Sequence, residues 1–217
     1  MFAGVRQRPV PDPLTPDAFA DAANVSRETL ERLTLYSGLL RKWAQRVNLV
    51  GKSTLDDVWR RHMLDSAQLL THIPAASQNL VDLGSGAGFP GMVLAIMGVP
   101  DVHLIESNAK KCAFLREVAR LTGAPVTIHN VRIEAPPPLK ADVVTARALA
   151  PMPLLFEYAQ SYLGPNSICL FLKGRGVEEE LTELRKIWNI RENRYRSVTD
   201  TEGFILRLEA LSHDPAR

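Results

Sequence analysis

The sequence predicts an α/β protein with a mostly parallel, seven-stranded sheet, helices on both faces of the sheet and an N-terminal helical extension. Two observations lead to this prediction. Short apolar runs alternate with helical stretches from residue 80 onward, and a glycine-rich loop follows the first of these runs. Alternating strands and helices form parallel sheets through right-handed crossovers, so the carboxyl ends of the strands meet at one edge.

Three regions are expected along the 217 residues. Residues 1–14 are rich in proline and are expected to form a disordered tail, and they lack the apolar segment of a secretory signal. Residues 15–75 are expected to form a helical cap, and residues 76–217 a ligand-binding domain that makes one compact unit with it. Because no run approaches the roughly 18 apolar residues of a membrane span, we expect a cytoplasmic protein.

Helix-start signals divide the cap into three helices. Thr15 is a hydroxyl N-cap followed by proline, which favours the first turn of a helix. A longer helix is predicted over 26–47, where apolar residues recur every three or four positions. Ser53 and Asp56 have the spacing of a capping box and predict a third helix that runs to about residue 70.

The seven strands are predicted from short apolar runs bounded by turn residues. They are Leu80–Leu83, Val102–Glu106, Val126–His129, Asp142–Thr145, Ile168–Leu172, Ile190–Ser197 and Phe204–Leu208. The helices expected between them are Pro90–Met97, Ala109–Leu121, Pro151–Tyr162 and Glu178–Trp188. A polar turn joins the last two strands, which are predicted to form a hairpin that closes the sheet.

The glycine-rich loop Asp82–Gly91 is the strongest local signal of a ligand site. Gly84, Gly86 and Gly88 let the backbone turn sharply and let a ligand lie against it. The loop formally matches a dinucleotide fingerprint, but Pro90 has no N–H to offer a pyrophosphate. Asp82 would repel such an anion by about 3 kcal/mol at an effective dielectric constant near 20. S-adenosylmethionine carries a cationic sulfonium and ammonium and no phosphate, so the loop favours it over NAD.

Glu106 ends the second predicted strand and supports a nucleoside ligand. Its carboxylate would lie at the same sheet edge as the glycine loop and could accept both ribose hydroxyls. This role is common to nucleotide and S-adenosylmethionine sites, so Glu106 alone does not separate a dehydrogenase from a methyltransferase.

Four segments resemble the RsmG (GidB) family of bacterial ribosomal RNA methyltransferases. They are Lys42-Trp43 with Asn48-Leu49, Arg61–Ser66, Asp82–Gly91, and Ala146-Arg147-Ala148 with Lys173-Gly174. The resemblance implies a Rossmann-like class I methyltransferase that uses S-adenosylmethionine. It further implies methylation of N7 of a guanosine in the 530 loop of the 16S rRNA decoding site.

The same resemblance adds residues to the candidate site. Gly84 and Phe89 would line the cofactor pocket, Ile133 and Glu134 would flank the adenine, and Arg147 would reach the methionine end or the target base. Together with the loop analysis, the candidate cofactor-binding residues are Asp82, Gly84, Gly86, Gly88, Phe89, Glu106, Ile133, Glu134 and Arg147. Arg147 is also the candidate positioning residue for catalysis.

The expected reaction needs little acid–base chemistry. Guanine N7 offers a lone pair and has no proton to lose, so positioning and charge stabilisation suffice. No general base is assigned, and no metal is expected because Cys112 and Cys169 are far apart and belong to no metal-binding motif. Both cysteines are expected to be free, buried thiols.

Local basic charge points to an RNA partner. The chain has a net charge of only +2, yet residues 41–62 hold six Lys or Arg against two acidic residues. Such a patch attracts phosphates, although a solvated helix face is the plainer explanation. The candidate RNA-binding residues are Arg41, Lys42, Arg46, Lys52, Arg60, Arg61, His62, Lys173 and Arg175. Taken alone, His62 would more often be a satisfied interface histidine.

Two other functions stay open at this point. A small-molecule methyltransferase would keep the same cofactor site, but it would more often have an apolar lid than a basic cap. A catalytically silent RNA-binding protein would have no need of an intact glycine loop with Asp82 and Glu106. The expected partner is 16S rRNA, possibly within the small ribosomal subunit, and a monomer is the expected state.

Overall fold

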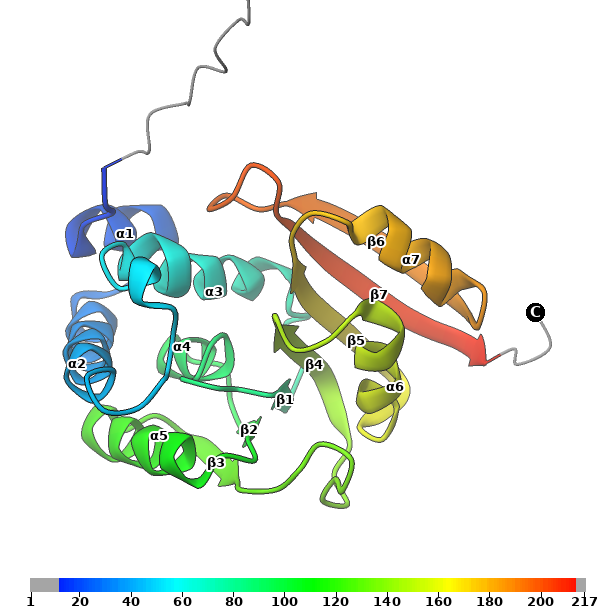
Figure 1. Ribbon diagram of the computed structural model, residues 1–217, viewed down its shortest axis with the longest axis horizontal. Coiled ribbons are helices and arrows are strands. Elements are labelled where there is room, and N and C mark those ends of the chain that lie inside the picture. The colour runs from blue at the N-terminus through cyan, green and yellow to red at the C-terminus, as the bar shows by residue number, and fades with distance from the viewer. Residues whose placement is uncertain (1–11, 214–217) are drawn as a thin grey trace, which may run out of the picture.

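The computed structural model describes residues 12–213, with side chains up to Glu209. One seven-stranded sheet forms its centre, in the order β3-β2-β1-β4-β5-β7-β6 (Figure 1). The strands are β1 (Leu80–Leu83), β2 (Val102–Ile105), β3 (Val126–His129), β4 (Ala141–Arg147), β5 (Leu163–Lys173), β6 (Trp188–Arg196) and β7 (Phe204–His213). Neighbouring strands pair in parallel except at β7, which is antiparallel to both β5 and β6. The predicted hairpin is confirmed, and its second strand inserts between β5 and β6.

Helices cover both faces of this sheet, as predicted (Figure 1). The cap helices α1 (Pro16–Ala23) and α2 (Arg27–Trp43) pack on the same side as α4 (Gly91–Ile96) and α5 (Ala109–Thr122). The opposite face carries α6 (Met152–Gln160) and α7 (Val177–Arg185). No helix in the described part of the chain is long and apolar enough to cross a membrane.

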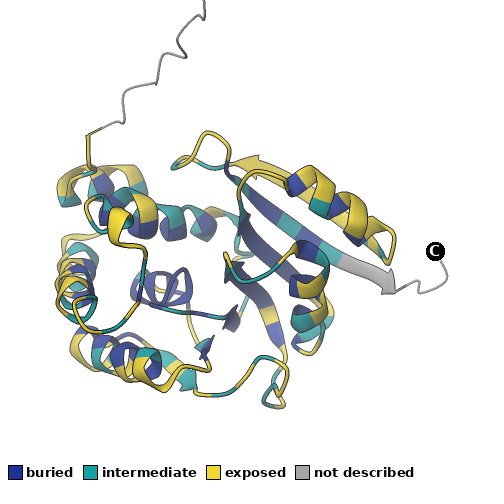
Figure 2. Cartoon of the chain, in the orientation of Figure 1, coloured by how far each residue is buried: buried dark blue, intermediate teal, exposed yellow. Residues whose placement is uncertain are grey.

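Each face of the sheet has its own hydrophobic core. Successive strand residues point to opposite faces, so Leu80 packs with the cap helices while Val81 and Leu83 pack with α6 and α7. The central strand β1 is therefore buried along its whole length, and β4 and β5 are buried over residues 143–146 and 168–172 (Figure 2). Such strands appear in the sequence as continuous apolar runs. Cys112 and Cys169 are free and buried, as predicted.

The third cap helix differs from its prediction. Ser53 lies in a short 3-10 turn, η1 (Lys52–Thr54), and the capping-box start was wrong. The helix begins later and is irregular throughout, as the wide π-turn η2 (Trp59–Leu64), α3 (Asp65–Ala67) and the 3-10 segment η3 (Gln68–His72). Asp57 anchors its start instead, because its carboxylate accepts the N–H of Leu14 at 2.8 Å and pairs with Arg60 at 2.9 Å.

These bonds also bear on the predicted N-terminal tail. Leu14, which the sequence placed in the tail, packs against the core beneath the cap helices. The carbonyl of Asp12 accepts a hydrogen bond from Arg60 at 2.6 Å. The remainder of the predicted tail, residues 1–11, lies outside the described residues.

Arg32 fastens the cap to the sheet layer. Its guanidinium donates to the carbonyls of Thr122 at 2.7 Å, Ile96 at 3.4 Å and Gly123 at 3.3 Å, which lie at the carboxyl ends of α4 and α5. A cation is favoured at such ends. We expect Arg32→Met to lower the free energy of unfolding by about 1–3 kcal/mol. Urea unfolding measures this, with exposed Arg27→Met as the control; equal stability of the two variants would contradict the assignment.

Candidate active site

The three loop glycines share a left-handed backbone but differ in the space around them. All have positive φ, at 63° for Gly84, 59° for Gly86 and 96° for Gly88. A Cβ on Gly88 would meet Tyr36 at 2.7 Å, and one on Gly84 would meet Leu149 at 2.5 Å. A Cβ on Gly86 would meet nothing closer than a carbonyl at 3.7 Å. Gly88 therefore serves packing, and Gly86 offers open backbone to a ligand.

Asp82 lies beneath this loop and is fully buried. Its carboxylate accepts the hydroxyl of Thr145 at 2.8 Å and the N–H of Gly91, the first residue of α4, at 3.3 Å. Burial raises the pKa of Asp82 to about 6, against the lowering effect of these hydrogen bonds and of Arg147. The start of α4 is thus already occupied by the carboxylate of this chain, which disfavours a pyrophosphate at this point, as the sequence predicts.

The raised pKa of Asp82 predicts a pH-dependent stability. The folded protein holds a proton between pH 3.8 and about 6 that the unfolded chain has lost, so ionisation costs stability as pH rises through this window. Complete ionisation of Asp82 lowers the free energy of unfolding by about 3 kcal/mol. Asp82→Asn cannot ionise, so its stability relative to the wild type should be greater at pH 7 than at pH 4. Urea unfolding at both pH values tests this, and a difference that is independent of pH would contradict it.

Glu106 follows the end of β2 beside the glycine loop. One carboxylate oxygen accepts the N–H of Gly86 at 2.9 Å and the other accepts the N–H of Asn108 at 2.7 Å. Asn130, just after β3, donates to the carbonyls of Glu106 and Ser107 at 3.1 and 2.9 Å and fixes this corner. Each carboxylate oxygen keeps a further lone pair for a hydroxyl donor.

Ile133 and Glu134 lie on the segment between β3 and β4. Ile133 is half-buried against the core under α6, whereas Glu134 is exposed and accepts from the Tyr158 hydroxyl at 3.4 Å. Both residues thus contact the face of the sheet that carries α6 and α7.

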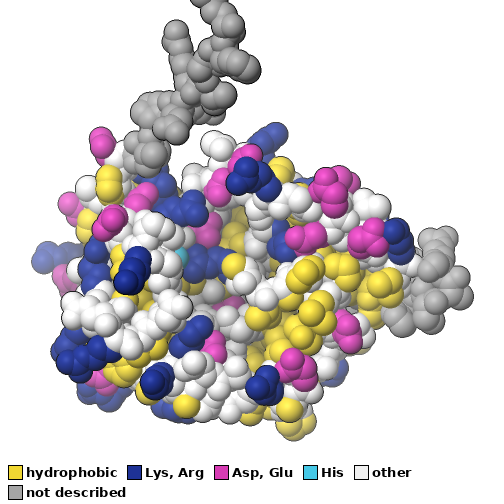
Figure 3. Space-filling model, in the orientation of Figure 1, with side chains coloured by type: hydrophobic (Ala, Val, Ile, Leu, Met, Phe, Trp, Pro, Cys, Tyr) yellow, Lys and Arg dark blue, Asp and Glu magenta, His cyan; other side chains and the backbone are white. Residues whose placement is uncertain are grey.

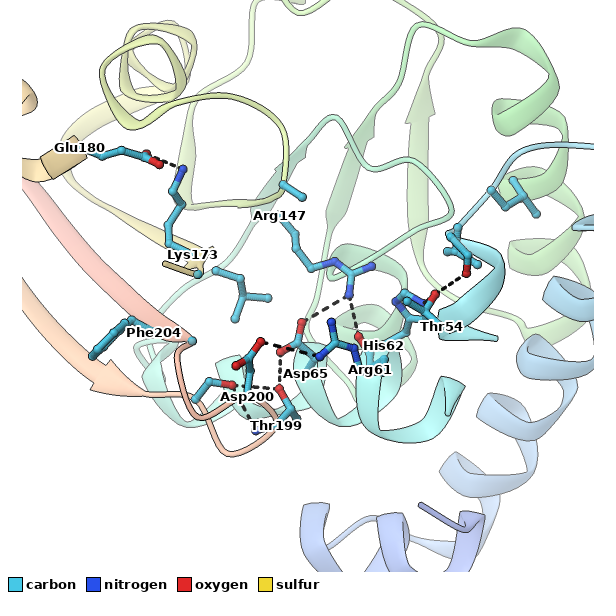
Figure 4. Close-up of a pocket in the computed structure, with 18 residues that line it drawn as sticks. Thr54, Arg61, His62, Asp65, Arg147, Lys173, Glu180, Thr199, Asp200 and Phe204 are labelled. Carbon is cyan, nitrogen blue, oxygen red and sulfur yellow. Dashed lines mark hydrogen bonds and ion pairs between the residues drawn. The ribbon is translucent and has the colours of Figure 1, made fainter. Parts of the chain in front are cut away.

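A cavity of about 450 Å³ opens at the ends of β4 and β5, next to the loop (Figure 4). Its walls come from the 49–54 segment, η2, the ends of β4 and β5, and the β6–β7 turn. Among the predicted residues it brings together Arg61, His62, Arg147 and Lys173. The glycine loop, Glu106, Ile133 and Glu134 lie outside its lining.

Phe89 and Arg147 form the boundary between loop and cavity. Phe89 is only 3% exposed and stacks on Tyr36 and on His62, with ring centroids at 5.3 and 4.8 Å. The Arg147 guanidinium lies 5.0 Å from the Phe89 ring centroid and donates to the carbonyl of Arg61 at 3.0 Å. Phe89 is therefore a packing platform under Arg147, and like Gly88 and Asp82 it is shielded from the open part of the edge.

His62 is buried and electrically neutral. Burial, then the charges of Arg147 and Arg61, lowers its pKa to about 3. Thr54 donates its only hydroxyl proton to the Gly51 carbonyl at 2.7 Å, so it accepts from His62 Nε2 at 2.8 Å. The other ring nitrogen, Nδ1, is then a bare acceptor, buried and without a hydrogen-bond partner among residues 12–213.

Asp65 also lines this cavity, although it is not among the site residues predicted from the sequence. One carboxylate oxygen accepts from Arg147 at 3.3 Å, and the other accepts from the Thr199 hydroxyl at 2.6 Å and from Gln68 at 3.0 Å. The residue lies within the Arg61–Ser66 segment that carried the family resemblance, which was the available signal. Its partner on the hairpin lies 134 positions away, so spacing could not reveal the contact.

Lys173 has a structural partner at the other side of the cavity. It is 11% exposed, forms an ion pair with Glu180 at 2.6 Å and donates to the Ala150 carbonyl at 3.1 Å. These contacts hold the loop after β4, in which Ala148 has a positive φ of 50°. The Lys173 ammonium is thus held in the cavity wall by these two contacts and is not available to bind an RNA phosphate.

The other predicted RNA-binding residues differ in their exposure and in their ion pairs. Lys and Arg side chains gather on the side that carries α2 and α5 (Figure 3). Arg60 is paired with Asp57, and Arg175 with Glu202 at 3.2 Å. The exposed residues on or next to the cap helices are Arg41, Lys42, Arg46, Lys52 and Arg61.

The residues present fit S-adenosylmethionine. Gly86 offers open backbone at positive φ beside the Glu106 carboxylate, whose negative charge suits a cationic ligand. The family model described as "rRNA small subunit methyltransferase G" matches residues 29–205. The chain belongs to this family.

Relatives of this family and solved structures agree with the match. The chain is 57% identical to the ribosomal RNA small subunit methyltransferase G of Paramagnetospirillum magneticum, over 93% of this chain and 98% of the relative. It is 56% identical to that of Rhodospirillum centenum, over 89% and 90%. In structure it resembles a putative O-methyltransferase from Klebsiella pneumoniae, with a TM-score of 0.56 and 12% identity over 90% of this chain and 96% of that one.

A second structural neighbour was solved with its cofactor. The glycopeptide N-methyltransferase MtfA, complexed with S-adenosylmethionine, gives a TM-score of 0.56 at 12% identity, over 67% of this chain and 92% of that one. At this identity the likeness concerns the fold. The sequence-based predictions of a Rossmann-like methyltransferase fold, of the family and of S-adenosylmethionine as cofactor are confirmed.

Proposed function

We propose that this methyltransferase modifies N7 of a guanosine in the 530 loop of 16S rRNA, within the small ribosomal subunit and as a monomer. The observation that carries the proposal is the family match, because the relatives that cover nearly the whole chain are named for the RNA of the small ribosomal subunit. The exposed basic residues of the cap supply a surface that can bind the phosphates of such a substrate.

Two ionisable groups of the cavity wall are poor proton acceptors, which suits a lone-pair nucleophile. His62 is a weak base because burial and the charges of Arg147 and Arg61 lower its pKa to about 3, and Asp65 already binds Arg147, Thr199 and Gln68. N7 needs no general base. Its lone pair bonds to the methyl carbon while the carbon–sulfur bond breaks, the electron pair stays on sulfur, and no proton moves.

In this proposal the two ends of the site have separate tasks. The bound cofactor supplies an electrophilic methyl group on a sulfonium. Gly86 and Glu106 bind its nucleoside part, with Ile133 and Glu134 beside the adenine, and Arg147 fixes the geometry where cofactor site and cavity meet. The cavity holds the target base, and its 450 Å³ lie within the range of about 300–1,000 Å³ typical of small-ligand sites.

The test is transfer of labelled methyl to small subunits that lack the modification, followed by nucleoside analysis. Label recovered as 7-methylguanosine and mapped to the 530 loop is the expected result. Label in another nucleoside, or none from protein that binds S-adenosylhomocysteine, would overturn the proposal. Free 16S rRNA as a parallel substrate separates recognition of the RNA from recognition of the assembled subunit.

A further inference from the structure

The β6–β7 turn, residues 197–203, forms one wall of the cavity. The sheet order places β7 and β6 beyond β5, whereas the glycine loop follows β1 on the other side of β4. A base in the cavity therefore has the cofactor side at the end of β4 and the turn on the opposite side. Figure 4 shows Asp200 and Thr199 on this turn, across from Lys173 and below Arg147.

Three carboxylates line the cavity, and they differ in how many donors they already bind. Asp65 accepts from Arg147, Thr199 and Gln68, and Glu180 accepts from Lys173 and the N–H of Met152. Asp200 accepts only the N–H of Glu202, at 2.9 Å, among the hydrogen bonds of the described residues. Its second oxygen lies 3.7 Å from Arg61, and its side chain is 44% exposed. Asp200 is therefore the most exposed of the three carboxylates and binds the fewest donors, so it is the one best placed to accept hydrogen bonds from a base.

Guanine carries the donors that such a group needs. Its Watson–Crick edge presents N1–H and the N2 amino group, whereas adenine presents a lone pair at N1. N7 lies on the opposite edge of the purine. A carboxylate on the Watson–Crick edge would therefore accept two hydrogen bonds from guanine, exclude adenine and leave N7 facing away from itself.

We propose that Asp200 is the residue that selects guanine, by accepting N1–H and the N2 amino group while N7 points toward the Arg147 end of the cavity. The proposal rests on the proposed function. N7 methylation leaves positive charge on the ring and makes N1–H a stronger donor. The hydrogen bonds to Asp200 therefore strengthen in the transition state, which favours catalysis as well as binding.

The turn is held firmly enough for this task. Thr199 donates to Asp65 at 2.6 Å, the N–H of Val198 donates to Gln68 at 3.0 Å, and Gln68 donates to Ser197 at 3.2 Å. Asp65 and Gln68 thus clamp the turn to the helix that also supports Arg147. Recognition groups held in this way select between ligands more sharply than mobile ones.

The test compares guanosine with inosine, which lacks only the N2 amino group, at the target position of 16S rRNA reconstituted into small subunits. The wild type should prefer guanosine by about 10-fold in kcat/KM. Asp200→Asn keeps an oxygen for the Glu202 N–H and turns a donor toward the base. It should lower kcat/KM on guanosine by about 10- to 100-fold and reduce the preference to near 1.

Glu202→Gln is the matched control, because Glu202 is a carboxylate of the same turn that faces Arg175 and does not line the cavity. It should keep the wild-type preference. S-adenosylhomocysteine binding checks that each variant is folded. An unchanged preference in Asp200→Asn would overturn the role of Asp200 while leaving the proposed function intact. A wild type that forms no 7-methylguanosine would overturn the proposed function itself.

Discussion

Replacing Gly86 by valine is expected to weaken S-adenosylhomocysteine binding by about 100-fold or more while the protein stays folded. Gly86 has a φ of 59° and open space where its side chain would project, next to Glu106. The added side chain would occupy the space against which the proposed cofactor lies. Calorimetric titration with S-adenosylhomocysteine measures the loss, and thermal unfolding reports the fold.

Gly123→Val is the matched control for Gly86→Val. Gly123 ends α5 at a φ of 63°, also with nothing near its missing side chain, and it lies away from the loop. Both variants should lose stability by about 1–2 kcal/mol from backbone strain. Only Gly86→Val should lose the ligand, and equal affinities in the two variants would remove Gly86 from the cofactor site.

Arg147→Met is expected to lower kcat/KM for methyl transfer by about 100-fold, or about 2.7 kcal/mol of transition-state stabilisation. Arg147 is 19% exposed and contacts Phe89, the Arg61 carbonyl and Asp65. Methionine fills much of the volume but leaves Asp65 without its cation. Steady-state kinetics on small subunits measures the loss, and a fall in kcat at saturating cofactor and RNA would show that positioning is impaired.

Arg185→Met controls for the loss of an arginine from an ion-pair network, here one on the surface. Arg185 pairs with Glu178 and Glu192 on the α7 side of the sheet, away from the cavity. It should change stability and leave kcat/KM near the wild-type value. An Arg147→Met enzyme with kcat/KM within 3-fold of wild type would exclude Arg147 from the reaction.

Asp65 connects Arg147, at the cofactor end of the cavity, with the β6–β7 turn, which carries the proposed guanine-selecting residue. One oxygen of its carboxylate binds Arg147 and the other binds Thr199 on the turn, so a shift in the position of Arg147 or of the turn is transmitted through this one carboxylate. Variants of Asp65 should therefore affect both guanosine preference and methyl transfer. Variants of Asp200 should affect mainly the preference and the steps that depend on it.

The sequence by itself determined the sheet and its ligand edge. A buried strand such as β1 leaves a short, mainly apolar run, and a glycine loop after this run marks where parallel strands end. These signals are local, so the sequence predicts the bounds of Val126–His129 to the residue and the position of Glu106 beside the loop. Motif resemblance supplied the family and cofactor.

Only the tertiary structure decided what each site residue contacts. The sequence shows one glycine-rich segment over residues 82–91, and packing in the folded protein buries Asp82, Gly88 and Phe89 within it. Asp65 meets Thr199 across 134 positions, and the His62 tautomer depends on a bond between Thr54 and Gly51. Such contacts arise where helix, strand end and hairpin converge in space, and pairing over that separation leaves no periodic trace in one chain.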